Sequence, residues 1–261
     1  VTNAVIDAMP SLRVISSFGV GLDKFDTTHT AARGIAVGYT PDVLNDCVAD
    51  MAFALLLGAG RRIAQADRYV RAGHWVAQPP QPFPLGFKVS GARLGIVGLG
   101  RIGRTIAQRS AGFDMAVRYH SRRPVADASW AHEPRLTELA RWADFLVVIT
   151  AGGAETRHLI NAEVLAALGP KGYLVNVARG SVIDEDALIA ALQSGGIAGA
   201  GLDVYAQEPQ VSEALRQLDN VVLAPHIASA TEQTRQAMAQ RVLDNLNAFF
   251  AGQPLLSAVG T

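Results

Sequence analysis

Short runs of apolar, often β-branched residues alternate along the chain with longer segments whose apolar positions recur at a helical period. Near-continuous apolar runs separated by helical segments are typical of parallel strands that helices bury on both faces. The right-handed crossover rule leaves an α/β fold with a doubly wound parallel sheet as the simplest topology. Six strands of this sheet are predicted, at 94–97, 115–119, 145–150, 173–177, 197–204 and 221–224.

Local signals predict where two long helices begin. Thr40-Pro41 offers a hydroxyl cap followed by a proline at the first helical position, which predicts a helix from there to Ala59. Ser229 and Glu232 have the spacing of a capping box, which predicts a last helix to about Phe250. The proline-rich stretch 78–84 cannot continue a helix and is predicted to form an extended arm.

The first 40 residues predict a smaller unit, with strands near 12–17 and 35–37 and a helix near 27–33. Two parallel strands and one helix cannot close a stable sheet alone. We therefore expect further strands from a preceding segment or a partner, so that the chain begins part-way through a domain.

Composition narrows the possible classes of protein. The 261 residues carry 23 basic and 23 acidic side chains, a balance that argues against a nucleic-acid partner. The longest apolar run, 51–60, is too short to span a membrane, and the N-terminus lacks the features of a signal peptide. A single cysteine, Cys47, fits a reducing compartment, and the histidines show no metal-ligand spacing. A cytoplasmic protein without a metal site is expected.

A glycine-rich loop follows the first strand of the predicted sheet and opens a helix. Glycines at its three fixed positions allow a tight turn and let backbone N–H groups approach a pyrophosphate at the helix N-terminus. In this strand–turn–helix setting the loop predicts a dinucleotide site, with a plain tight turn as the alternative. Its residues are Gly98, Leu99, Gly100, Arg101, Ile102 and Gly103.

The end of the second strand bears on the choice of cofactor. NAD-preferring sites place an acid there to hold the ribose hydroxyls. This chain instead has His120, Ser121, Arg122 and Arg123, and two guanidinium groups can hold the 2′-phosphate of NADP. The turn predicts an NADPH preference with NADH still possible, and a solvated basic turn is the alternative.

Ionisable residues follow three successive strands, whose carboxyl ends meet at one edge of a parallel sheet. They are Arg179, Glu208 and His226. His226 paired with Glu208 could donate a proton to a carbonyl oxygen, while Arg179 could clamp a carboxylate, which predicts a small 2-oxo acid substrate.

Each of these residues also has a plainer interpretation. Arg179 could be a surface guanidinium, Glu208 a loop acid and His226 a structural histidine. Asp203, inside an apolar strand, is either a buried, satisfied acid or a cofactor contact, and we favour the cofactor contact.

Five motifs in order resemble the D-isomer-specific 2-hydroxyacid dehydrogenases over nearly the whole chain. Within that family the chain is most similar to the NADPH-linked glyoxylate/hydroxypyruvate and hydroxyphenylpyruvate reductases. The motifs are the SFGVGLD segment at 17–23, the glycine loop at 98–103, VNVARG at 175–180, GLDV at 201–204 with Glu208-Pro209, and APH at 224–226.

The resemblance implies roles for individual residues. Arg179 would bind substrate, His226 would be the acid/base and Glu208 would orient it. Backbone amides of Val20 and Gly21 would hold the substrate carboxylate. The implied cofactor contacts beyond the two turns above are Thr150, Ala151, Thr156, Val177, Ala178 and, to the nicotinamide amide, Asp203.

The resemblance also implies a homodimer and an organisation in two domains. A dinucleotide-binding (Rossmann) domain at 42–229 would be inserted into a smaller flavodoxin-like substrate domain formed by 1–41 and 230–261, with about one strand–helix–strand unit missing before Val1. The expected activity is reduction of a glyoxylate- or hydroxypyruvate-type 2-oxo acid to a D-2-hydroxy acid. The alternatives are a nucleotide-sensing, corepressor-like interaction protein and a dehydrogenase of another small anion.

Overall fold

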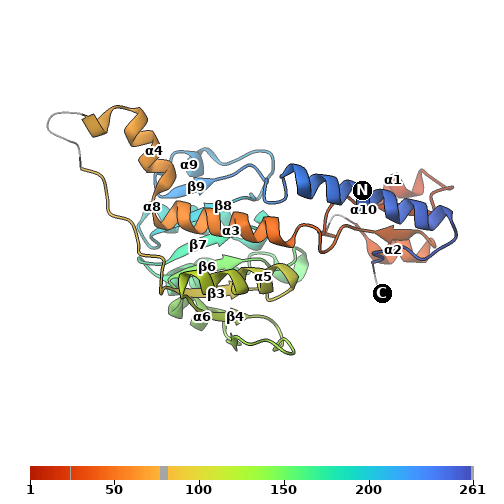
Figure 1. Cartoon of the computed structure of the whole chain (residues 1–261), viewed down its shortest axis with the longest axis horizontal. Coiled ribbons are helices and arrows are strands. Elements are labelled where there is room, and N and C mark those ends of the chain that lie inside the picture. Colours follow the sequence, from red (N-terminus) through yellow and green to blue (C-terminus); the bar gives the residue numbers. More distant parts are fainter. Residues whose placement is uncertain (24, 77–81, 260–261) are drawn as a thin grey trace. The chain divides into compact units, whose positions relative to one another are not determined.

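The computed structural model divides the chain into two compact units (Figure 1). Unit 1 consists of Val1–Cys47 and Ser229–Thr261, and unit 2 of Val48–Ala228. The structure describes residues 1–23, 25–76 and 82–259. Residues 78–81 of the predicted arm lie outside these ranges, and 82–84 have no regular secondary structure. None of the helices described is long and apolar enough to cross a lipid bilayer.

Unit 2 is built on a seven-stranded parallel sheet in the order β5-β4-β3-β6-β7-β8-β9. From β3 the chain winds outward through β4 and β5, then returns to the other side of β3 with β6. This reversal confirms the predicted doubly wound sheet. The strands are β3 (Arg93–Val97), β4 (Ala116–His120), β5 (Ala131–His132), β6 (Phe145–Val148), β7 (Tyr173–Asn176), β8 (Gly199–Leu202) and β9 (Val221–Leu223).

Helices cover both faces of this sheet. On one face α3 (Asn45–Gly60) crosses β8 so closely that a Cβ added to Gly201 would lie 2.8 Å from the Cβ of Leu55. Phe53 of α3 stacks on Phe113, just beyond α5 (Arg101–Arg109), with ring centroids 5.3 Å apart. On the other face a buried apolar cluster joins the sheet to α6 (Leu136–Trp142), α7 (Ala162–Leu168) and α8 (Glu185–Gln193). Unit 2 also contains α4 (Ile63–Arg71) and the short α9 (Glu213–Arg216).

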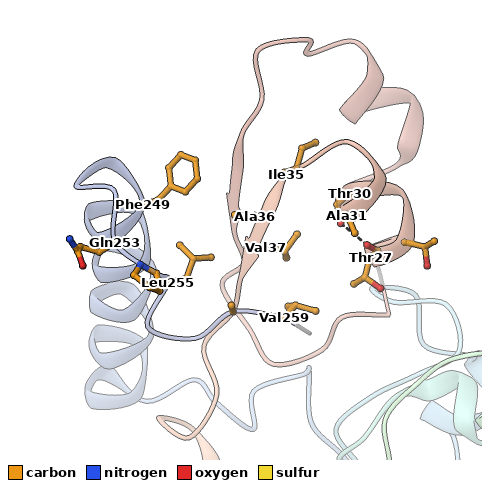
Figure 2. A pocket seen from close by; sticks show the side chains of 13 residues that line it. Thr27, Thr30, Ala31, Ile35, Ala36, Val37, Phe249, Gln253, Leu255 and Val259 are labelled. Atoms are coloured by element: carbon orange, nitrogen blue, oxygen red, sulfur yellow. Dashed lines mark hydrogen bonds between the residues drawn. The ribbon is translucent and has the colours of Figure 1, made fainter. Parts of the chain in front are cut away.

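Unit 1 pairs β1 (Val14–Ser16) with β2 (Ala36–Gly38) in parallel. Buried Asn245 accepts a hydrogen bond from the Ser257 amide at 3.1 Å, which joins the segment around Ser257 to α10 (Glu232–Phe250). A hollow of about 740 Å³ lies between α2 (Thr27–Ala32), β2 and the segment after α10, and none of the predicted site residues lines it (Figure 2). The helices of this unit are α1 (Asn3–Asp7), α2 (Thr27–Ala32) and α10 (Glu232–Phe250).

Both predicted helix starts were wrong by a few residues. Asp42 has a left-handed backbone (φ +69°), so no helix can run from Pro41, and α3 begins at Asn45. Thr231, not Ser229, caps α10, because its hydroxyl accepts from the Thr234 amide at 3.3 Å. Strand β5 was not predicted, since two residues are too few for any periodic pattern.

Candidate active site

The carboxyl ends of the central strands of unit 2 lie level with one another. Val148 pairs with Val97 and with Asn176, Asn176 pairs with Leu202, and Leu202 pairs with Leu223. Strands are about 4.8 Å apart, so the segments that follow these residues emerge side by side at one edge. All the predicted site residues of unit 2 lie on these segments or on the turn after β4.

The glycine loop forms a cradle at the start of α5. Gly98 has φ +102°, and a Cβ there would lie 2.9 Å from the Thr150 amide nitrogen. A Cβ on Gly103 would lie only 2.1 Å from the Gly98 carbonyl oxygen, so this turn requires glycine at both positions. Gly100 caps the helix and faces open space. The open position beside the helix N-terminus leaves room for a pyrophosphate, so the residues present fit a dinucleotide.

The turn after β4 contains two exposed arginines and no acid at 120–123. The Ser121 hydroxyl donates to the Arg123 carbonyl at 2.6 Å, which tightens the turn. Arg122 forms an ion pair with Glu155, which lies on the segment after β6, and both side chains are largely exposed. An anion bound at Arg122 would therefore compete with this carboxylate.

The segment after β6 carries three of the residues expected at the cofactor. Thr150 is half-buried beside the glycine loop, and Ala151 is exposed. The Thr156 hydroxyl donates to the Ala151 carbonyl at 2.7 Å and so closes the turn between them. This hydroxyl shapes the loop.

The turn after β7 presents Arg179. Buried Asn176 accepts from the Ala178 amide at 3.0 Å and donates to the Arg179 carbonyl at 3.1 Å, which folds the chain at the end of the strand. Val177 and Ala178 are buried, and the Arg179 guanidinium donates to the Ala178 carbonyl at 2.8 Å. A guanidinium at this edge can bind a carboxylate in two-pronged fashion.

Glu208 and His226 are in direct contact. The His226 Nδ1 lies 2.7 Å from the Glu208 Oε2, and the imidazole is 46% exposed. The Tyr205 amide donates to the Glu208 Oε1 at 3.2 Å, so both carboxylate oxygens are engaged. A carboxylate on Nδ1 fixes the orientation of the ring and leaves Nε2 as the nitrogen that can donate to a substrate.

Asp203 supports the turn that carries His226. It is 1% exposed, and its two carboxylate oxygens accept from the amides of Ile227 and Ala228, each at 2.8 Å. Burial raises the pKa of Asp203 above its ordinary value, and these two hydrogen bonds oppose the shift. Asp203 is thus a buried acid whose hydrogen bonds are satisfied, which was one of the two interpretations. Its place beside the His226 turn leaves the other interpretation, a cofactor contact, as a prediction.

The two residues predicted in unit 1, Val20 and Gly21, follow β1 and are half-buried. The Thr40 amide donates to the Gly19 carbonyl at 3.0 Å, which fixes the start of their loop.

Four residues of the site edge were not predicted: Glu155, Asn176, Gly180 and Tyr205. Asn176 could have been noticed as the one polar residue that ends a run of buried strand residues. Gly180 lies in the motif at 175–180 but gave no sign of its contact with Tyr205. Glu155 and Tyr205 gave no such signal, because Arg122 and Ala224, which they contact, are distant in the sequence.

Comparison with known proteins agrees with this geometry. The NAD-binding domain model of the D-isomer-specific 2-hydroxyacid dehydrogenases matches residues 53–228. Hydroxyphenylpyruvate reductase of Plectranthus scutellarioides is 48% identical over 255 residues, which are 98% of this chain and 80% of that protein. Glyoxylate/hydroxypyruvate reductase A of Arabidopsis thaliana is 46% identical over the same shares.

A solved structure is similar over the same extent. It is the NADPH-dependent glyoxylate/hydroxypyruvate reductase of Sinorhizobium meliloti in complex with NADP and malonate, 48% identical, with a TM-score of 0.93 over 98% of this chain and 80% of that one. The sequence matches, the doubly wound sheet and the glycine loop agree, and the chain belongs to the D-isomer-specific 2-hydroxyacid dehydrogenase family.

Proposed function

We propose that the protein reduces small 2-oxo acids of the glyoxylate or hydroxypyruvate type to D-2-hydroxy acids with NADPH. The observation that carries the proposal is the His226–Glu208 contact of 2.7 Å at the edge of the sheet that also holds the glycine cradle. A general acid and a nucleotide cradle at one edge suit the reduction of a carbonyl group. Relatives named glyoxylate and hydroxyphenylpyruvate reductases support the choice of substrate class.

In this proposal His226 is the proton donor. With Glu208 on Nδ1, the imidazolium donates from Nε2 to the substrate carbonyl oxygen as that oxygen gains charge. Arg179 binds the substrate carboxylate and polarises the neighbouring carbonyl. Val20 and Gly21 are proposed as further substrate contacts because the family resemblance of the 17–23 segment implies them.

Bound NADPH would supply the hydride. The residues of the glycine loop, 98–103, would hold its pyrophosphate, and Ser121, Arg122 and Arg123 would hold its 2′-phosphate. The relative from Sinorhizobium meliloti that is NADPH-dependent supports this choice. The remaining proposed cofactor contacts are Thr150, Ala151, Thr156, Val177, Ala178 and, through lone pairs not used by the backbone, Asp203.

Steady-state kinetics with both cofactors tests the proposal. Oxidation of NADPH should follow addition of glyoxylate or hydroxypyruvate, with hydroxyphenylpyruvate and 2-ketogluconate in the same panel. Replacing Arg122 and Arg123 together by alanine should lower kcat/KM for NADPH by roughly 10- to 100-fold and leave NADH within about twofold. Absence of turnover across the panel would contradict the proposal and favour a nucleotide-sensing protein.

We further propose that the protein is a homodimer. Five large apolar side chains on and after α4 are more than half exposed, a concentration that is typical of an interface. Light scattering should give twice the chain mass, and Val70→Asp with Val76→Asp should lower it, whereas Leu243→Asp in α10 should not. The five side chains are Ile63, Val70, Trp75, Val76 and Leu85.

A further inference from the structure

Tyr205 is a buried residue that takes no part in the chemistry proposed above. It follows β8 and is 6% exposed. Its hydroxyl donates to the Ala224 carbonyl at 2.9 Å, and the Leu202 carbonyl lies 3.3 Å from the same oxygen. The hydroxyl therefore lies at the point where β8 and β9 end.

The hydrogen bond from Tyr205 to Ala224 lies just before the turn that carries His226. Ala224 is two residues before His226, and its amide donates to the Leu202 carbonyl at 2.8 Å. The hydrogen bond from the Tyr205 hydroxyl to the Ala224 carbonyl is a second interaction of this residue, just before the chain turns at Pro225. His226 itself has a left-handed backbone (φ +54°), a conformation that a non-glycine residue keeps only when its surroundings hold it.

The main chain of Tyr205 contacts the other two segments. Its amide donates to the Glu208 Oε1 at 3.2 Å. Its carbonyl oxygen lies so close to Gly180 that a Cβ there would be 1.8 Å away, which fixes the turn directly after Arg179. One residue thus contacts the segments of the proton donor, of its carboxylate partner and of the guanidinium.

We propose that Tyr205 is a positioning residue, whose hydroxyl aligns the His226 imidazole with Glu208. The inference rests on the proposed function for its kinetic consequences only, because the alignment of the ring can be measured without turnover. Misplacement of a reacting group by about 1 Å can cost about 100-fold in rate. Loss of the hydroxyl hydrogen bond, with the aromatic ring of residue 205 still in place, should lower kcat roughly 10-fold.

Tyr205→Phe tests the proposal, with Tyr173→Phe as the matched control. Tyr173 is half-buried at the amino end of β7, the end opposite to the site, so its variant makes the same chemical change away from the site. Tyr205→Phe should lower kcat about 10-fold, keep KM for NADPH within about twofold and enlarge the solvent deuterium isotope effect on kcat. Tyr173→Phe should change none of these.

Nitrogen-15 spectra of the histidines provide the measurement that needs no turnover. At a pH at which the ring is neutral, the His226 signals, assigned by their loss in His226→Ala, should show the proton on Nδ1 in the unmodified protein and in Tyr173→Phe. In Tyr205→Phe they should shift toward a mixture of the two tautomers. Unchanged His226 signals would overturn the inference, even if kcat fell. If the unmodified protein turned over no 2-oxo acid, the proposed function would fail and these spectra alone would decide the role of Tyr205.

Discussion

Asp203 and His226 are joined through the backbone. The His226 amide donates to the Asp203 carbonyl at 2.8 Å, while the carboxylate of Asp203 holds the amides of the next two residues. Asp203, a buried acid that follows β8, therefore accepts hydrogen bonds from three consecutive amides of the turn after β9. Asp203 therefore holds in place the turn that carries the proposed proton donor, His226.

Asp203→Asn should separate this role from general stability. The amide has only one acceptor oxygen, so its NH₂ group would face a backbone N–H and one hydrogen bond would be lost. We expect a loss of about 1–3 kcal/mol in unfolding free energy and a fall in kcat of at least roughly 10-fold. Asp144→Asn is the control, because Asp144 accepts a hydrogen bond from the Arg93 amide at 2.8 Å at the amino ends of β3 and β6, away from the site. Equal effects of both changes on kcat would contradict the assigned role.

His226→Ala should lower kcat by roughly 10²–10⁴, because it removes the proposed proton donor. Steady-state assays with a 2-oxo acid and NADPH measure it. His29 is the matched control, since it also contacts a carboxylate, Asp7, at 2.8 Å, in unit 1. A His29→Ala variant should keep kcat within about twofold, and a comparable loss in both variants would argue against a special role for His226.

Arg179→Lys should fail to replace the guanidinium, since an ammonium group cannot make two parallel hydrogen bonds to a carboxylate. We expect kcat/KM for the 2-oxo acid to fall roughly 10- to 100-fold, while KM for NADPH stays within about twofold. Arg141→Lys on α6 makes the same change at an exposed ion pair with Glu138. If lysine at 179 kept full activity, the two-pronged clamp would be wrong.

Two alanine substitutions in the glycine loop should behave differently. Gly103→Ala would place a Cβ 2.1 Å from the Gly98 carbonyl, so it should lower Tm without any cofactor present. At Gly100 a Cβ meets open space, so Gly100→Ala should keep Tm and weaken NADPH binding instead. Thermal unfolding and fluorescence titration measure the two effects. Equal NADPH affinity in Gly100→Ala and the unmodified protein would contradict a pyrophosphate at this position.

Alkaline pH should weaken the fold partly through Tyr205. Burial, with the nearby Asp203 charge, raises the pKa of Tyr205 to about 12. A raised folded pKa means that the unfolded chain loses its proton first, so the contribution to stability is complete below pH 10 and declines as the pH rises toward 12. At pH 11 the loss should be roughly 1 kcal/mol relative to pH 9. Urea unfolding at both pH values should show a smaller decline in Tyr205→Phe, and an equal decline would refute the shift.

Much of the fold followed from periodicity, because each buried strand carries its own apolar run. The placement of Glu208 and His226 at neighbouring strand ends followed from the parallel topology, and the structure brings these two side chains together. This contact could be predicted without knowing the loops between the two residues, since the carboxyl ends of parallel strands lie at the same side of the sheet.

What the sequence did not predict depends on partners that are distant along the chain. Glu155 pairs with Arg122 and Tyr205 packs against Gly180 only once β4, β6, β7 and β8 are assembled. The helix expected at Thr40 failed for a local reason instead, since the left-handed backbone at Asp42 overrides a good capping signal. A capping residue favours the start of a helix, but the helix begins there only if the residues that follow have a helical backbone.

The alignment of Val148, Asn176, Leu202 and Leu223 limits how this protein can change. Inserting a single residue inside any of these strands would turn every later side chain of that strand to the opposite face and would displace the loop beyond it. Insertions and deletions should therefore be tolerated in connecting loops away from this edge, where chain length can vary without moving Arg179, Glu208 or His226. A library of one-residue insertions along the gene should show four short intolerant windows at these strands.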